Sequence, residues 1–108
     1  MVIAVAHVRS GVRGEYIGRA GYGRAGSPLG NPARIGVDGT RTQVIAKYEQ
    51  WLAAKIASGD RAVLNELDRL ARIARETGTL TLLCFCAPEA CHGDVIARVL
   101  RERTNAAR

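Results

Sequence analysis

Two spacings of hydrophobic residues occur along this chain, and together they predict strands and helices in one domain. Met1–Arg9 is rich in Val, Ile and Ala, as expected of a strand, and Glu15–Arg19 has the pattern of a shorter one after a glycine-bounded turn. Thr79–Phe85 is an almost continuous apolar run, which is typical of a strand covered on both faces. The sequence therefore predicts a short sheet of three strands.

Helices are expected between and after these strands. Thr40 and Gln43 have the spacing of a capping box, and apolar residues then recur at helical spacing. Asp60 is placed to cap a second helix, and Gly78 is placed to end it. A third amphipathic helix is expected after Pro88. The apolar stripes of the first and third helices consist of Val44, Ile45, Tyr48, Trp51, Leu52 and Ile56, and of Val95, Ile96, Val99 and Leu100.

The order of these elements indicates the fold class. Helices that cross between strands are typical of a small Rossmann-like α/β domain, with three layers around a short central sheet. At 108 residues the chain has the length of a single domain, 1–108, and it contains no internal repeat. Between the second strand and the first helix lies Gly21–Pro32, whose glycines and prolines exclude a regular element. Loops of this length are often functional.

Composition limits where the protein works. No apolar run approaches the roughly 20 residues that span a bilayer, and the apolar start is too short for a signal peptide. We therefore expect a cytoplasmic protein with no membrane partner. The three cysteines fit a disulfide framework poorly, because their number is odd and cytosolic thiols stay reduced.

The net charge of +6 is unevenly distributed. Residues 1–36 contain five arginines against one acidic residue, Glu15. Such an excess serves solubility, or it serves an anionic partner such as a nucleotide or nucleic acid, since arginine binds phosphate in a bidentate way.

The segment Cys84–Asp94 is the strongest candidate for chemistry, because it leads from a buried strand into a helix. Ligands of open α/β sheets sit beyond the carboxyl ends of strands, and helix N-termini attract anions. Catalysis by a thiolate of Cys91 or Cys86 is one interpretation, with His92 as base or cationic partner and Asp94 as an orienting or acid–base group. Zinc held by Cys84, Cys86, Cys91 and His92 is the second, although the spacing is unlike that of common zinc knuckles. Buried structural cysteines, with Asp94 complementing the helix dipole, are the third, and this is the favoured interpretation of Cys84.

The glycine-rich loop and the strand before it are expected to supply the ligand contacts. Polar side chains occur there next to residues that stiffen the backbone or let it approach a ligand. The candidate ligand-binding residues are Tyr16, Arg19, Arg24, Ser27, Gly30 and Asn31. The loop matches neither the dinucleotide fingerprint nor a P-loop.

Four motifs carry a family resemblance: Tyr16–Arg19, Ser27–Pro32, Cys84–Pro88 and Cys91–Asp94. They resemble a small domain family of phages and bacteria, domain of unknown function 4326, over nearly the whole chain. Phe85 stands where that family leads us to expect tryptophan. The last motif is also similar to the Cys-His-Arg end of domain of unknown function 488, with Gly93 in place of arginine. The resemblance implies an α/β fold and a phage or bacterial association, and no mechanism.

Three functions follow as hypotheses. The first is a nucleotide- or nucleic-acid-binding protein, and further an enzyme that acts at a phosphate or N-glycosidic bond. The second is a non-enzymatic zinc-stabilised module that binds nucleic acid. The third is a phage accessory protein that binds a protein partner. No cofactor is indicated, and a homodimer is compatible with so small a chain.

Overall fold

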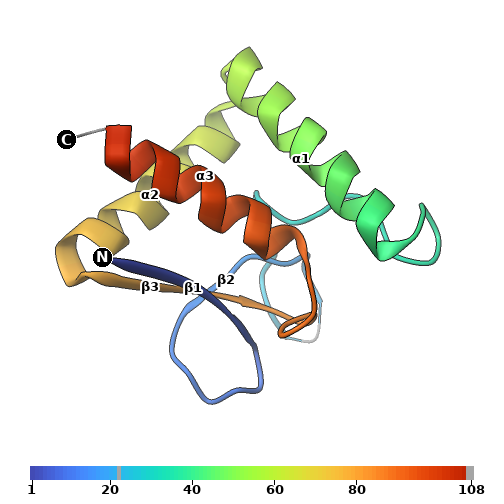
Figure 1. Cartoon of the computed structure of the whole chain (residues 1–108), viewed down its shortest axis with the longest axis horizontal. Helices are drawn as coiled ribbons and strands as arrows, with labels where there is room; N and C mark the ends of the chain where they lie inside the picture. Colours follow the sequence, from blue (N-terminus) through green and yellow to red (C-terminus); the bar gives the residue numbers. More distant parts are fainter. Residues whose placement is uncertain (22, 107–108) are drawn as a thin grey trace.

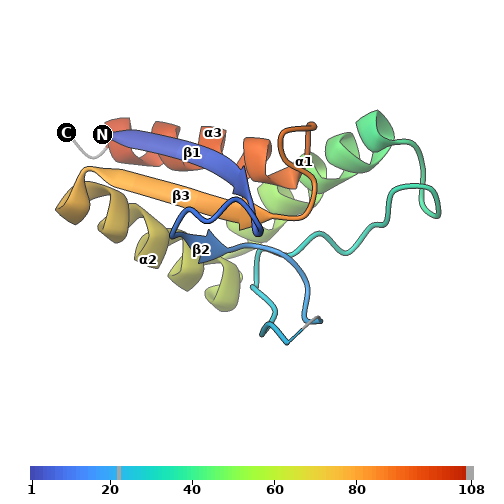
Figure 2. The same cartoon turned by 90° about the horizontal axis from the view of Figure 1, so that it is seen from below.

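Three parallel strands form a sheet at the base of the molecule (Figures 1 and 2). The computed structural model of the chain describes residues 1–21 and 23–106. β3 (Thr79–Cys84) is central, with β1 (Val2–His7) on one side and β2 (Glu15–Tyr16) on the other. In register, Val2 pairs with Thr79 and Tyr16 with Leu83. The prediction that β2 extends to Arg19 was wrong, and β3 ends one residue before Phe85.

The helices begin and end where the local signals predict. α1 (Arg41–Ser58) is opened by Thr40 and Gln43 in a complete capping box. Asp60 caps α2 (Arg61–Thr77), since its carboxylate accepts the N–H of Val63 at 3.0 Å. Gly78 ends α2 in the left-handed region, with φ of 80°, and β3 follows directly. The third predicted helix is α3 (His92–Ala106).

The helices lie together on one face of the sheet (Figure 2). α2 and α3 pack against the strands and against each other, and α1 packs on both of them. The core lies between these layers, and its largest fully buried members include Ile17, Leu29, Tyr48, Leu52, Leu67, Leu70, Leu82, Ile96 and Leu100. The predicted Rossmann-like α/β arrangement is confirmed. The prediction of three layers was wrong, because the helices pack against one another on a single face of the sheet (Figure 2). No helix in the described part of the chain is long and apolar enough to cross a membrane.

The other face of the sheet is crossed by the connection 8–14. This segment returns from the end of β1 to the start of β2, passing over β3 (Figure 2). The crossing is so close that a Cβ at Gly14 would collide with the carbonyl oxygen of Thr81. The end of β3 is consequently buried on both faces, at Leu82, Leu83 and Cys84. The carboxyl ends of β2 and β3 lie on the side where the candidate motifs gather.

Candidate functional site

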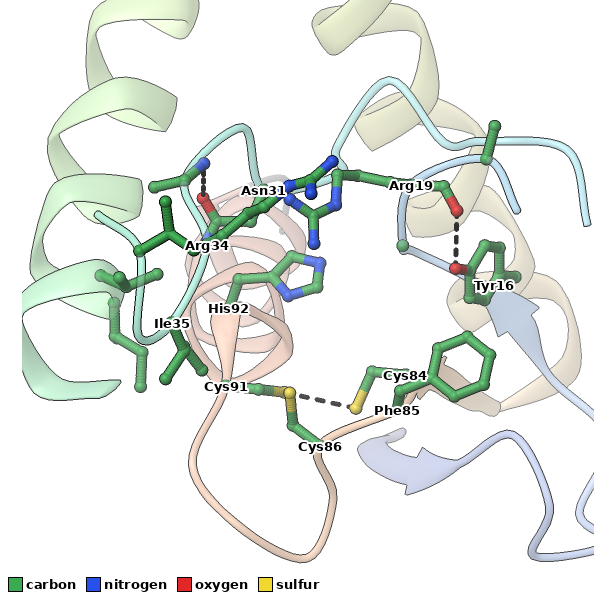
Figure 3. A pocket seen from close by; sticks show the side chains of 16 residues that line it. Tyr16, Arg19, Asn31, Arg34, Ile35, Cys84, Phe85, Cys86, Cys91 and His92 are labelled. Carbon is green, nitrogen blue, oxygen red and sulfur yellow. Dashed lines mark hydrogen bonds between the residues drawn. The ribbon is translucent and has the colours of Figure 1, made fainter. Parts of the chain in front are cut away.

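A pocket of about 510 Å³ lies at the carboxyl ends of β2 and β3 (Figure 3). Its wall combines the segment after β2, the loop before α1, the start of α1 and the segment between β3 and α3. The lining residues are Tyr16, Gly18, Arg19, Ala20, Asn31, Ala33, Arg34, Ile35, Val37, Val44, Ile45, Cys84, Phe85, Cys86, Cys91 and His92. Segments far apart in the sequence thus meet at the edge where open α/β sheets bind ligands.

Tyr16–Arg19 is a tight structure that presents one arginine to the pocket. The Tyr16 hydroxyl donates a hydrogen bond to the Arg19 carbonyl oxygen at 2.7 Å, so the chain folds back over the ring. Gly18 leaves room for that ring, because a Cβ there would force the Tyr16 ring to move. Ile17 is fully buried and anchors the segment in the core. The Arg19 side chain is left at the pocket (Figure 3).

The segment Ser27–Pro32 is a structural turn more than a binding surface. The Ser27 N–H donates to the Gly18 carbonyl at 2.9 Å, and the Gly30 N–H closes the turn on the Ser27 carbonyl at 2.9 Å. Leu29 is fully buried, and its carbonyl accepts the Tyr48 hydroxyl at 2.6 Å. Neither Ser27 nor Gly30 lines the pocket. The turn fixes Asn31, which does line it and whose Oδ1 accepts the Ala33 N–H at 2.9 Å.

Two arginines converge at this pocket without an acidic partner. The guanidinium groups of Arg19 and Arg34 point toward one another above His92 (Figure 3). Neither forms an ion pair with any acidic residue in the described part of the chain. Arg24 is placed differently, with its guanidinium 5.3 Å from the centre of the Tyr16 ring and outside the pocket lining.

His92, the first residue of α3, is a buried pocket histidine. Its Nε2 lies 2.8 Å from the Ile17 carbonyl oxygen, which only accepts hydrogen bonds, so Nε2 carries the proton. The ring also packs edge-on against Tyr48, with centroids 5.0 Å apart. Burial lowers the pKa of His92, and the positive charge of Arg19 lowers it further. The imidazole is therefore neutral near pH 7, with Nδ1 as its lone-pair nitrogen.

Cys84 and Cys91 form a buried thiol pair beside the pocket. Their Sγ atoms lie 3.3 Å apart, and both residues are only 2 % exposed. The Ala87 N–H donates to Cys84 Sγ at 3.4 Å. The Cys91 thiol, hydrogen-bonded to Cys84, lowers the pKa of Cys84, and that same interaction raises the pKa of Cys91. Of the two thiols, Cys84 is therefore the one that loses its proton more readily.

Asp94 belongs to the start of α3 and does not touch the histidine. Its Oδ2 accepts the Cys91 N–H at 3.0 Å, while Cys91 Sγ accepts the Gly93 N–H at 3.3 Å. The Asp94 bond is one half of a capping box, whereas the Cys91 sulfur accepts the N–H of the second helical residue and not that of the third. Asp94 is exposed and lies outside the pocket lining, so the structure does not show it orienting His92.

The residues suggested as zinc ligands do not assemble into a metal site. Among residues 1–21 and 23–106 no three His, Cys, Asp or Glu side chains converge in a geometry that could hold an ion. Cys84 and Cys91 bond to each other, and the Nε2 of His92 is occupied by Ile17. The chemistry of this site is that of thiols, an imidazole and guanidinium groups.

Most of the predicted site residues meet in the pocket. Those that line it are Tyr16, Arg19, Asn31, Cys86, Cys91 and His92, and those that do not are Arg24, Ser27, Gly30 and Asp94. Sequence reasoning missed Arg34 and Phe85, and it considered Cys84 as a structural residue or a zinc ligand but not as a partner of Cys91. Phe85 is 39 % exposed beside Tyr16, with ring centroids 6.0 Å apart, and its position directly after a strand was the available signal. No local pattern distinguishes Arg34 from other loop arginines.

A family model matches the part of the chain that contains the four motifs. The model of the family described as domain of unknown function (DUF4326) matches residues 5–102. The chain belongs to this family. No match to the chain was found among curated proteins or among solved structures. The DUF4326 match covers all four motifs that build the pocket, from Tyr16 to Asp94.

Proposed function

We propose that this DUF4326 domain binds a nucleotide in the pocket at the carboxyl edge of its sheet. The observation that carries the proposal is the convergence of Arg19 and Arg34, both without an acidic partner among the described residues, over a neutral histidine. Two guanidinium groups that face each other in one pocket (Figure 3) repel each other, and an anion between them removes that repulsion. Phosphate fits best, because each guanidinium can donate two hydrogen bonds to its oxygens.

The rest of the pocket suits the nucleoside part of such a ligand. Its volume of about 510 Å³ lies within the range of small-molecule sites. Tyr16 and Phe85 contribute aromatic surface on one side, and Val44 and Ile45 contribute aliphatic surface on another. Asn31 uses its Oδ1 within the loop, so its amide N–H groups remain to recognise a ribose or base.

The arginines, and not the α3 N-terminus, are the anion-binding groups in this proposal. The N–H groups of Cys91 and Gly93 at that terminus already donate to Asp94 Oδ2 and Cys91 Sγ. A phosphate there would compete with bonds that stabilise the helix. The guanidinium groups of Arg19 and Arg34 are exposed, so a phosphate can bind them without competing with hydrogen bonds that stabilise the helix.

His92 is the group of this pocket best suited to proton transfer. A neutral imidazole with its Nε2–H fixed on Ile17 leaves Nδ1 to accept a proton from water or a hydroxyl group. Hydrolysis or transfer at a phosphate or N-glycosidic bond is the reaction class that such a base beside two arginines would serve. This catalytic step rests on ligand binding, which is tested first.

Thermal melting of the reduced protein with nucleotides, nucleosides and ADP-ribose is the test. A ligand at about 100 times its Kd adds about 2.7 kcal/mol of stability, which raises Tm by several degrees. We expect nucleotides to raise Tm and nucleosides to have much less effect, because only nucleotides carry phosphate. The Arg19→Ala and Arg34→Ala variants should each weaken binding about 10- to 100-fold, the worth of a charged hydrogen bond.

Arg72→Ala is the matched control, since Arg72 is an exposed arginine on α2 and outside the pocket. It removes the same charge and should leave nucleotide binding unchanged. Equal weakening of nucleotide binding in all three variants would mean that only the net charge matters, and it would contradict a site at Arg19 and Arg34. If no nucleotide raises the Tm of the wild-type protein, nucleotide binding itself is contradicted.

A further inference from the structure

We propose that Cys84 and Cys91 are a redox-active dithiol, converted by hydrogen peroxide into an intramolecular disulfide. This modification site is independent of nucleotide binding. Three observations support it: the distance between the two sulfurs, the position of each cysteine in the fold, and the ionisation of the pair.

The sulfurs are close to bonding distance before any oxidation. Their separation of 3.3 Å must shorten to about 2.05 Å, a movement of little more than an ångström. Cys84 ends β3 and is held in the sheet by its pairing with His7. Cys91 follows the irregular segment 85–90, so this side of the pair can supply the movement.

The route for the oxidant is the pocket. Both Cys84 and Cys91 contribute to its lining, although each is only 2 % exposed. Hydrogen peroxide is small enough to reach the two sulfurs through the pocket, whereas a disulfide in another folded protein is too large to enter it. The Figure 3 view shows the two sulfurs facing each other at the edge of this space.

The chemistry balances with peroxide as the only co-reactant. The Cys84 thiolate attacks one peroxide oxygen, the O–O bond breaks, and hydroxide leaves, giving a sulfenic acid on Cys84. Cys91 sulfur then attacks Cys84 Sγ, and the S–O bond breaks. The thiol proton leaves with the hydroxyl group as water. Two thiols are oxidised by two electrons, and one peroxide is reduced to two waters.

The electrostatics favour Cys84 as the attacking sulfur. The hydrogen bonds from Cys91 and from the Ala87 N–H lower the pKa of Cys84, which favours the thiolate on this sulfur. Thiolates, not thiols, react with peroxide. Cys91 then supplies the resolving sulfur, already in contact with the atom it must attack.

Cys86 is the competing site, since it is half-buried and also lines the pocket. It is therefore removed in the decisive experiment. The Cys86→Ser variant is treated with hydrogen peroxide, denatured, alkylated and cleaved after glutamate. Cleavage after Glu89 separates Cys84 from Cys91, so a disulfide between them joins two peptides that reductant releases. We expect this joined pair.

Two results would overturn the proposal: two alkylated thiols after peroxide, or a stable sulfenic or sulfinic acid on Cys84 with Cys91 still free. In the wild-type protein the same treatment should leave Cys86 as the one alkylated cysteine. A disulfide that includes Cys86 there would equally contradict the assignment. Because Cys86→Ser changes a half-buried loop residue, its folding is checked by its melting curve before oxidation.

Discussion

At the scale of single residues, His92 shows how burial selects one protonation state. Its ring is 9 % exposed, and its one hydrogen bond within the described structure fixes the proton on Nε2. The charge of Arg19 acts in the same direction as burial, because both lower the pKa of His92. An anion bound between Arg19 and Arg34 would reduce this effect. Ligand binding and the ionisation of His92 are therefore linked.

This environment predicts an acid-sensitive fold. Since the pKa of His92 is lower in the folded than in the unfolded protein, the unfolded state binds the proton more readily. The stabilisation that comes from neutral His92 should be fully present above about pH 6.5. The free energy of unfolding should then decrease as the pH falls from there towards the pKa of His92 in the folded protein. Urea unfolding between pH 7.5 and the acid range measures this.

The matched variants for that measurement are His92→Gln and His7→Gln. A glutamine at position 92 can still donate to the Ile17 carbonyl but does not titrate, so the decrease due to His92 should disappear. His7→Gln should retain it. A wild-type curve without any decrease, or one unchanged by His92→Gln, would show that His92 is not held neutral.

At the scale of elements, the start of α3 combines a helix cap with the thiol pair. Cys91 accepts the Gly93 N–H with its sulfur and donates its own N–H to Asp94. The segment 85–90 before it is held from α1, where Arg41 donates to the Ala90 carbonyl at 2.8 Å and pairs with Glu89 at 3.1 Å. The position of Cys91 thus depends on both helices.

Replacing Asp94 tests this structural role. Asp94→Ala removes the acceptor of the Cys91 N–H and a negative charge near the helix N-terminus, which together are worth about 1 kcal/mol. We expect the Tm to fall by about 4–8 °C, with nucleotide binding at saturation unchanged. Glu102→Ala, an exposed carboxylate further along α3, is the control and should shift the Tm by much less. Unaltered stability with lost turnover would restore Asp94 as a catalytic residue.

The elements were predictable where their signals are local. Thr40 with Gln43, Asp60 and Gly78 mark helix ends through contacts within four residues, so the sequence contains them directly. β2 ends early because the Tyr16 hydroxyl turns the chain back at Arg19, a local contact that the strand pattern of the sequence does not indicate. Arg34 reaches the pocket through a loop whose path depends on Leu29 and Tyr48, and no local pattern encodes that path. The thiol pair was missed because strand alternation places Cys84 but not its distance to Cys91.

At the scale of the whole molecule, the positive charge is least compensated near the N-terminus. In the described structure Arg41, Arg69, Arg98 and Arg103 each pair with an acidic side chain. The five arginines of residues 1–36 do not, and Glu15, the acidic residue among them, pairs with Arg69. Those five are Arg9, Arg13, Arg19, Arg24 and Arg34. They divide into two that line the pocket and three that lie outside it.

This division allows a measurement that separates a nucleotide site from a nucleic-acid surface. Binding of a single-stranded oligonucleotide changes with salt by a slope of about −0.7 in log K against log salt for each phosphate contacted. If Arg19 and Arg34 bind one phosphate between them, as we expect, fluorescence anisotropy should give a slope of about −0.7. If Arg9, Arg13 and Arg24 each contact a further phosphate, the slope should be about −2.8. The double variant Arg9→Ala/Arg13→Ala decides between them, because it leaves the first slope unchanged and makes the second shallower by about 1.4. The steeper slope would make the domain a nucleic-acid-binding protein whose pocket holds one nucleotide of a longer strand.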